Sequence, residues 1–443
     1  MTEDILIVWE AHGYAAVKEA LKNMNSADIA DEIEKAESNI AIKIFRALPK
    51  DKAAKVFAHL SGSSRENIIE AITDKEIHSI VDDMFLNDAV DFIEEMPANV
   101  VKRVLKNISK DRRDLINTFL CYPKESVGSV MSIEYISIKA EFTVAAALTY
   151  LRKNVSKKNV IHTCYVTDGE RRLIGTVSAS DLLLASPKNI IRNIMKSGPV
   201  SANTTEDQES LTNIFRKYDL LSLPVVDSER RLVGIVTVDD VLDVQQEEAT
   251  EDFEIMAGIS PIETPYLKTN VFTLTRNRVI WLLALMLSAT ITGSIISSFE
   301  NALTVLPALI AFIPMLMDTG GNAGAQSSTL IIRGMALNEI TLHNTFAVLW
   351  KELRVALVCG LILSGINLVR VLIFNYDILL AVTVSSSLFA TVIMAKTVGG
   401  MLPMAAKRIG IDPAVMASPL ITTIVDAGAL IVYFMLAKFL LGI

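Results

Sequence analysis

The chain has 443 residues, a net charge of −8 and a hydrophobic fraction of 51%. Residues 276–443 hold seven Asp and Glu against ten Lys and Arg, whereas residues 1–275 carry a net charge of −11. Such an acidic first part excludes nucleic acid as a partner, because its phosphates require Lys and Arg. Three widely spaced cysteines exclude a disulfide framework and a zinc-finger spacing. The composition predicts a soluble acidic module joined to a weakly basic membrane module.

The first predicted domain, residues 1–125, is helical and cytosolic. Within residues 26–122, apolar residues recur at helical spacing. The segments IFRALPKDKAAKVFAHL and FIEEMPANVVKRVLKNI resemble each other, and Pro49 and Pro97 are each placed to open a helix. An all-α superhelical domain is the simplest interpretation.

Residues 126–245 contain an internal repeat with a period of 59 residues. Three landmarks recur at that distance: Asp168, Gly175 and Asp181 match Asp227, Gly234 and Asp240. Each unit predicts a short strand, a helix, two strands joined by a tight turn, and a final helix. The pattern resembles a tandem CBS pair, which is an α/β regulatory module rather than an enzyme.

The resemblance to CBS pairs raises the question of an adenine nucleotide. In such pairs an acid after G-x-x-[ST]-x-x is a frequent ribose contact, and Asp181 and Asp240 match that position. Ser178 and Thr237 equally predict helix N-caps that engage the same two acids. Both interpretations stay open, so ATP is a candidate ligand of this domain.

Residues 246–275 are predicted to form a connecting helix that leads to the membrane. The stretch TVDDVLDVQQEEATEDFE, residues 237–254, leads into this segment and holds eight acids and no base. Asp239, Asp243, Glu247 and Glu251 step by four along one helix face, where like charges destabilise a helix. A solvated acidic face is one interpretation. The absence of a compensating lysine in this stretch favours a cation-dependent joint.

The last predicted domain, residues 276–443, is a transmembrane pore domain with five helices. Its apolar segments are each long enough to cross a bilayer: 279–299, 303–333, 346–374, 378–406 and 413–441. Basic residues flank alternate ends of these segments, which places the N-terminal domains in the cytoplasm and the C-terminus outside. The acidic start of the chain lacks the features of a signal peptide and agrees with that orientation.

Asp426 lies near the middle of the fifth segment, where an isolated carboxylate costs a few kcal/mol or more. It is either a structural acid or a ligand in a cation path, and intramembrane ionisable groups favour the second interpretation. Lys396, in the fourth segment, either pairs with Asp426 and makes both structural or extends to the cytoplasmic surface.

Pro307, Pro314 and the run MDTGGNAGAQSS predict a broken helix in the second segment. Gly320 and Gly321 can unwind a helix and free backbone carbonyls, to which Asn322 and Asp318 add side-chain oxygens. An oxygen-only set suits Mg²⁺ or Ca²⁺. The alternative is a glycine-rich helix-packing motif. Because one acid is few for a divalent ion, a homodimer with two Asp426 around its axis is favoured.

Two stretches carry a specific family resemblance. Pro314–Gln326 resembles the P-x-L-x-x-x-G-G-N-x-G-x-Q signature of the MgtE family of magnesium channels and transporters, and Gly399–Gly428 resembles that family's fourth and fifth helices. The resemblance implies a homodimer that binds hydrated Mg²⁺ at the membrane midplane, with Asp426 as the main ligand. The expected pore-metal residues are Asp426, Asn322, Asp318, Gly320, Gly321 and Ser418.

The same resemblance implies regulatory Mg²⁺ sites among the N-terminal domain, the CBS pair and the connecting "plug" helix. The matching acids are Asp88, Asp91, Asp207, Glu209, Asp219, Asp240, Asp243, Glu248, Glu251 and Asp252. Asn87 stands where a second acid is expected. At high cytosolic Mg²⁺, bound ions would hold the acidic faces together and close the pore, and their loss would open it.

The sequence thus predicts a multi-pass plasma-membrane protein, not an enzyme, that takes up Mg²⁺ and is gated by cytosolic Mg²⁺. One alternative is a coupled exchanger or exporter of another divalent cation such as Co²⁺. Another is a membrane receptor whose CBS pair senses a nucleotide.

Overall fold

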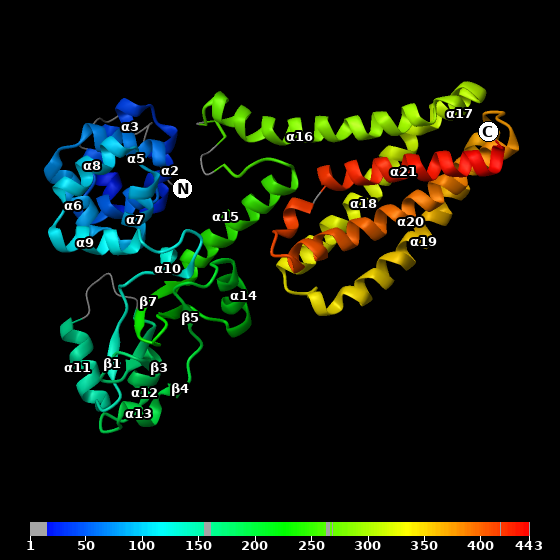
Figure 1. The fold of residues 1–443 in the computed structure, drawn as a ribbon. Helices are drawn as coiled ribbons and strands as arrows, with labels where there is room; N and C mark the ends of the chain where they lie inside the picture. The colour runs from blue at the N-terminus through cyan, green and yellow to red at the C-terminus, as the bar shows by residue number, and fades with distance from the viewer. Residues whose placement is uncertain (1–15, 155–160, 263–265, 268, 417, 443) are drawn as a thin grey trace. The chain divides into compact units, whose positions relative to one another are not determined.

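The computed structural model describes residues 16–154, 161–262, 266–267, 269–416 and 418–442. The chain forms two compact units, one ending at Gln246 and the other beginning at Glu247. Figure 1 shows the helical and sheet-containing parts of the first unit and the long helices of the second.

The first unit begins with short helices that build an all-α domain. They are α2 (Ser26–Lys35), α3 (Ser38–Ala47), α4 (Lys50–Ala58), α5 (Gly62–Ala71), α6 (Asp74–Asp83), α7 (Leu86–Glu95), α8 (Ala98–Asn107) and α9 (Lys110–Phe119). Each packs against the next helix but one, as α2 does on α4 and α7 on α9. Pro49 and Pro97 directly precede α4 and α8, as predicted. Phe57 contacts Phe45 and Phe92 edge-on in the core.

The rest of the first unit is the predicted pair of α/β repeats. Its elements are α10 (Val127–Val130), β1 (Ser137–Lys139), α11 (Val144–Asn154), β2 (Thr163–Thr167), β3 (Leu173–Ser178), α12 (Ala179–Leu184), α13 (Ile191–Ile194), β4 (Lys196–Ser197), β5 (Ala202–Asn203), α14 (Glu209–Tyr218), β6 (Ser222–Val226) and β7 (Leu232–Thr237). The sheets have the orders β1-β2-β3-β4 and β5-β6-β7. In both repeats a parallel strand pairs with an antiparallel hairpin.

The 59-residue period extends to backbone detail. The register shifts between Val166 and Thr167 in the first hairpin and at the equivalent place in the second. Arg171 and Arg230 both have positive φ, +66° and +62°. The carboxylates of Asp168 and Asp227 each accept two backbone N–H bonds within their turns. The internal repeat predicted from the sequence is confirmed.

One helix, α15 (Val238–Met256), leaves the second repeat and crosses from one unit to the other. It starts directly after β7 and stops well before residue 275, which corrects the helix predicted over 246–275. Its end is set by Gly258, whose φ of +70° suits glycine, and by a bond from the N–H of Ile259 to the carbonyl of Glu254. The next long helix begins at Val271.

The second unit is a bundle of long helices. Its elements are α16 (Val271–Ser298), α17 (Glu300–Val305), η1 (Pro307–Phe312), α18 (Ile313–Ala336), η2 (Leu342–Asn344), α19 (Thr345–Ile373), α20 (Ile378–Arg408), η3 (Pro413–Met416) and α21 (Ser418–Leu441). Among the described residues, four segments are long and apolar enough to cross a membrane: Val271–Ser298, Leu342–Ile373, Ile378–Arg408 and Pro413–Leu441. The expected fifth span, α18, is not among them, since its run MDTGGNAGAQSS is polar.

The predicted break in the second apolar segment occurs at Pro307, one of the places where it was expected, and not at the glycine run. The chain is interrupted around Leu306 and Pro307, because proline lacks the N–H that a continuing helix needs. From Ile313 onward α18 is continuous, so the expectation that Gly320 and Gly321 unwind it is wrong. These glycines instead permit close helix packing, and a Cβ on Gly320 would lie 2.7 Å from Cγ2 of Thr391.

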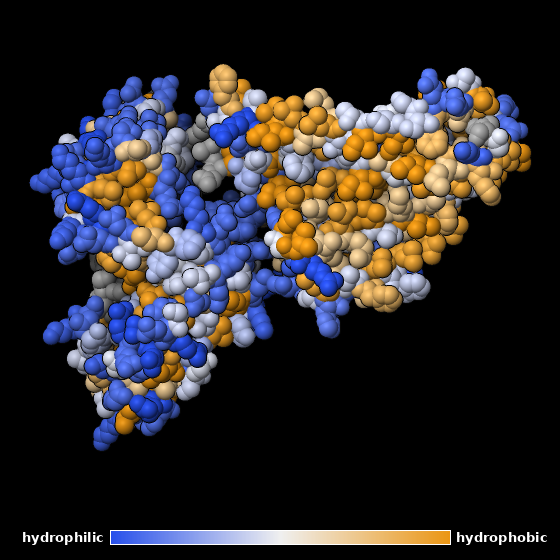
Figure 2. All heavy atoms as spheres, in the orientation of Figure 1, coloured by the Kyte–Doolittle hydropathy of each residue, from blue (hydrophilic) through white to orange (hydrophobic). Residues whose placement is uncertain are grey.

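The core of the bundle lies among α18, α20 and α21, which contact one another (Figure 1). A close approach of α18 and α20 is made by two glycines: a Cβ on Gly399 would lie 2.2 Å from the carbonyl oxygen of Gly324. By contrast, α16 buries no residue, and it shares a wide apolar surface with its neighbours (Figure 2). That surface suits lipid or another membrane-embedded partner.

Candidate ion-binding sites

The first candidate site joins α18 and α21. Asp426, half-buried on α21, lies close enough to Asp318 of α18 for their carboxylates to interact electrostatically. Asn322, one turn after Asp318, donates a 3.1 Å hydrogen bond to Oδ1 of Asp318. The side chains of Asp318 and Asn322 are exposed. Two helices therefore place two carboxylates within electrostatic range of each other, and Asn322 adds an amide oxygen beside Asp318. Carboxylate and amide oxygens are ligands that Mg²⁺ prefers.

The remaining residues of the expected pore set have other surroundings. Gly320 and Gly321 are buried, and a Cβ on Gly321 would lie 3.0 Å from Cγ2 of Thr422 on α21. Their carbonyls belong to a continuous helix, so they are not freed as a break would free them. The side chain of Ser418 lies outside the described part of the chain. Both glycines instead hold α18 close to its neighbours.

Lys396 neither pairs with Asp426 nor extends to the surface. It is 6% exposed, and its amino group lies 3.5 Å from Oγ of Ser327 on α18. Among the described residues it forms no ion pair. The carboxylate of Asp426 is therefore not neutralised by this lysine within the chain.

The second candidate site lies in the first unit, between α7 and the start of α15. Burial raises the pKa of Asp240 to about 6, against the hydrogen bonds that Thr237 gives it, and Asp239 and Asp88 add to the rise. Burial also raises the pKa of Asp88. Buried carboxyls with raised pKa values are groups that a cation would stabilise in their ionised form.

Asn87 is the residue that the sequence alone left out of this site. Its side-chain N–H donates a 2.9 Å hydrogen bond to Oδ1 of Asp240, and Asn87 is 8% exposed. Its own Oδ1 is buried and has no hydrogen-bond partner among the described residues. Asp91, the other expected acid of α7, is exposed. On α15, Asp243 has a pKa raised by burial and by Asp239.

The three acids expected on the second CBS repeat are not brought together. Oδ1 of Asp207 accepts a 2.9 Å bond from the N–H of Glu209 at the start of α14. Asp219 ends the same helix in a left-handed conformation with φ +50°. The ten residues of α14 rise about 15 Å between them. Within one chain these acids belong to two separate places.

The third candidate site, in the second unit, lies near the end of α15. Burial raises the pKa of Asp252, Asp412 adds to the rise, and Arg333 opposes it. Nearby on α15, Ile255 and Met256 pack with Ile332 and Ala414. Glu251, which directly precedes Asp252, and Glu248, one turn earlier on α15, are half-buried. The sequence did not predict that Asp412 lies near Asp252, because the two residues are 160 positions apart along the chain.

No three His, Cys, Asp or Glu side chains within the described ranges converge closely enough to hold a bare metal ion. Within the described part of the chain, each candidate site therefore brings carboxylates near one another without a closed set of three protein ligands. That arrangement suits Mg²⁺, which keeps several of its waters and uses few protein ligands. It does not suit zinc or copper, which require His or Cys ligands.

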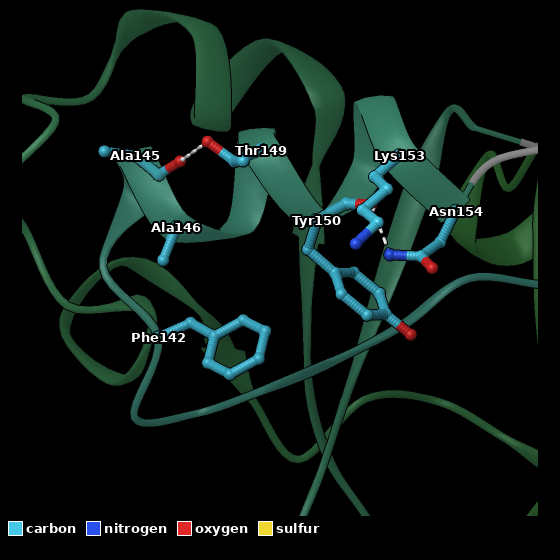
Figure 3. A pocket seen from close by; sticks show the side chains of 7 residues that line it. All are labelled: Phe142, Ala145, Ala146, Thr149, Tyr150, Lys153 and Asn154. Carbon is cyan, nitrogen blue, oxygen red and sulfur yellow. Dashed lines mark hydrogen bonds between the residues drawn. The ribbon is translucent and has the colours of Figure 1, made fainter.

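The acids expected to contact a nucleotide serve as helix caps. Asp181 and Ser178 form a capping box at the start of α12, and Asp240 makes the equivalent bonds to Thr237. The capping interpretation is therefore realised for both acids. A separate open pocket of about 520 Å³ lies on α11 of the first repeat (Figure 3). It is lined by Phe142, Ala145, Ala146, Thr149, Tyr150, Lys153 and Asn154.

Comparison with known families covers most of the chain. Residues 313–436 match MgtE, a divalent cation transporter family, and residues 24–125 match the MgtE intracellular N domain. Residues 127–188 and 191–247 each match the CBS domain.

Similar proteins and a similar structure agree with those matches. The chain is 35% identical to the magnesium transporter MgtE of Thermus thermophilus, over 96% of this chain and 95% of that one. It is 30% identical to the MgtE of Bacillus subtilis, over 89% and 90% of the two chains. A crystal structure of the cytosolic domain of the Mg²⁺ channel MgtE in complex with ATP matches with a TM-score of 0.52 and 29% identity. It covers 55% of this chain and all of the other.

Proposed function

Because the chain belongs to the MgtE family of divalent cation transporters, and is a transporter rather than an enzyme, we propose that it takes up Mg²⁺. In this proposal it is a multi-pass protein of the plasma membrane with its N-terminal domains in the cytoplasm and its C-terminus outside. Mg²⁺ is both its substrate and its regulator.

The electrostatic interaction of Asp426 with Asp318, to which Asn322 is hydrogen-bonded, is the observation that supports an ion path. A carboxylate at membrane depth is costly unless it serves a polar path, and α18 presents two further oxygen ligands beside it. A single chain offers few charges for a divalent ion. We propose a homodimer in which two copies of Asp426 face a hydrated Mg²⁺ on a shared axis.

Regulation by cytosolic Mg²⁺ is supported by the continuity of α15. Its first turn carries Asp240, whose carboxylate meets α7, and its last turn packs beside Ile332 of α18. Cation binding at the acids along α15 therefore acts on the helix that carries Asp318. We propose that high Mg²⁺ closes the path and low Mg²⁺ opens it. The ion shifts this equilibrium through its higher affinity for the closed state.

We also propose ATP as a ligand of the CBS pair. The support is the ATP-bound cytosolic domain of the related Mg²⁺ channel. In this chain Asp181 and Asp240 already cap helices, so a bound ribose would compete with those bonds. Equilibrium binding of labelled ATP to the purified protein, with Asp181→Ala as the comparison, tests this part separately.

The central test is Mg²⁺ uptake by Mg²⁺-starved cells that produce Asp426→Asn, Asp426→Ala or the unaltered protein. We expect both variants to lose uptake, because the amide keeps the size of the side chain but not its charge. Glu339→Gln, which changes an exposed acid after α18, is the matched control and should transport normally. Normal uptake by Asp426→Asn at equal protein levels would refute the ion path.

The second candidate function is a coupled exchanger or exporter of another divalent cation such as Co²⁺. The driving force of the ion flux distinguishes it from a channel. In liposomes, flux through a channel follows the imposed membrane potential. Flux through an exchanger follows the gradient of its counter-ion. A receptor that only senses nucleotide would show no ion flux.

A further inference from the structure

A buried polar cluster joins three helices away from Asp426. Oγ of Ser327, on α18, donates a 2.6 Å hydrogen bond to Oε2 of Glu352 on α19. The amino group of Lys396, on α20, lies 3.5 Å from the same hydroxyl. Ser327 and Lys396 are buried and Glu352 is half-buried. The bundle thus contains an ammonium group and a carboxylate that share one serine.

The hydrogen-bonding roles fit a charge-balanced arrangement. Lys396 can only donate, an ionised Glu352 can only accept, and the hydroxyl of Ser327 does both. A buried lysine without a negative partner would cost several kcal/mol. Among the described residues, Glu352 is the acid that the hydroxyl of Ser327 contacts. The cluster is therefore neutral as a whole when both charges are present.

The cluster is rigidly connected to the proposed ion path. Ser327 lies nine residues after Asp318 on the same continuous helix, a rise of about 13 Å. One turn before Ser327, Gly324 meets Gly399 of α20 in backbone contact. The positions of Lys396 and Asp318 are thus fixed relative to each other by α18 and α20, with no flexible segment between them.

We propose that Lys396 is the internal counter-ion of Glu352 and that their balance sets the electrostatic potential of the ion path. This inference rests on the proposed function. The ammonium group of Lys396, linked to Glu352 through the hydroxyl of Ser327, balances the charge that a bound cation would otherwise balance. The carboxylate therefore does not hold a permeating ion in the half of the bundle beyond Asp318. Lys396 acts through this field and not as a ligand.

The size of the effect follows from Coulomb's law. At about 13 Å and an effective dielectric constant of about 40, between that of a protein surface and that of bulk water, one uncompensated unit charge changes the affinity for a divalent ion by about tenfold. The direction depends on which partner is removed. Loss of Lys396 leaves a negative charge that attracts Mg²⁺, and loss of Glu352 leaves a positive charge that repels it.

The test measures initial rates of Mg²⁺ uptake into liposomes against Mg²⁺ concentration for the full-length protein. Lys396→Met should lower the half-saturating concentration by about tenfold and slow the maximal rate, because the ion leaves less readily. Glu352→Gln should raise that concentration by about tenfold. The double variant Lys396→Met/Glu352→Gln should return to within about threefold of the unaltered protein. Opposite shifts that cancel are not produced by damage to packing alone.

If a single variant is not produced as folded protein, the proposal is tested with the double variant. We expect it to accumulate and transport as the unaltered protein does, because both charges leave together. Shifts of the two single variants in the same direction, unchanged half-saturation in both, or a double variant worse than either would overturn the proposal. Absence of flux through the unaltered protein would instead overturn the proposed function, so the two failures are distinguishable.

Discussion

The side-chain amide of Asn87 donates a 2.9 Å hydrogen bond to the carboxylate of Asp240, joining α7 of the helical domain to the first turn of α15. Two carboxylates at this place would repel each other and need a cation between them, whereas an amide and a carboxylate attract. This part of the contact therefore forms without Mg²⁺. A cation would still stabilise the ionised forms of the neighbouring acids Asp88 and Asp243, because burial raises the pKa of each.

Asn87→Asp should make this contact dependent on Mg²⁺. The variant replaces a donor to a charged group by a like charge, so without Mg²⁺ the free energy of unfolding of the first unit should fall by about 2 kcal/mol. Saturating Mg²⁺ should restore it. Thermal unfolding of the full-length protein in EDTA and in Mg²⁺ measures both values. Asn107→Asp on α8 is the control, and an equal loss in both variants would contradict the role of Asn87.

Stability without Mg²⁺ should fall as the pH rises. The pKa of Asp240 is about 6 in the folded unit against an ordinary value near 4, so the folded state binds this proton more tightly than the unfolded chain. The contribution is present at acid pH and is lost as the pH passes from about 4 to above 6, by at most about 3 kcal/mol. Mg²⁺ at pH 7.5 should offset the loss.

The measurement is the melting temperature in EDTA between pH 5 and 7.5. Asp240→Asn should flatten the profile, since the group no longer titrates. The hydrogen bonds from Thr237 and Asn87 have amide oxygen as an alternative acceptor, so the variant should still fold. A melting temperature of the unaltered protein that rises with pH over this range would show that Asp240 does not titrate as stated.

Neutralising acids of α15 should weaken inhibition by cytosolic Mg²⁺. Converting a two-state gate from 1:99 to 99:1 takes about 5.5 kcal/mol, so each of several weak sites supplies a share. Asp243→Asn with Glu248→Gln should raise the inhibitory Mg²⁺ concentration by about tenfold. Patch recordings with Mg²⁺ applied to the cytoplasmic face measure it. Inhibition identical to that of the unaltered protein would remove these two acids from the gate.

The close approach of α18 and α20 should not tolerate a methyl group. In Gly399→Ala the added Cβ would lie 2.2 Å from the carbonyl oxygen of Gly324, so the helices must separate, at a cost of about 3 kcal/mol. Gly365→Ala on α19 is the matched control, because its Cβ would meet open space. Thermal stability in detergent should drop for the first variant and stay level for the second.

The sequence predicted the domains where its signals are local. Helical periodicity marked the all-α domain, and the 59-residue period identified the paired repeats, because equivalent side chains recur at equivalent places in both. The sequence did not predict the local structure where one composition is compatible with two conformations. The glycine run before Asn322 can either unwind a helix or pack closely, and only its neighbours decide between the two. Thr391 and Val425 fill the space beside Gly320, so α18 stays helical.

The candidate sites divide in the same way. Asp426 was evident from the sequence, because a carboxylate in an apolar segment is conspicuous wherever that segment packs. The partners of Lys396 were not, because Ser327 and Glu352 lie 69 and 44 residues away along the chain. Nor was the bond from Asn87 to Asp240, which spans 153 residues.

Residue identities and their spacing along the chain determined which elements form, which acids are exceptional and which family the chain resembles. The tertiary structure alone decided which charges face one another. That choice depends on how helices remote in sequence approach in space, and here glycine contacts such as Gly324 with Gly399 set the approach. Electrostatic energy depends on distance in space, so spacing along the chain could name the charged groups but not pair them.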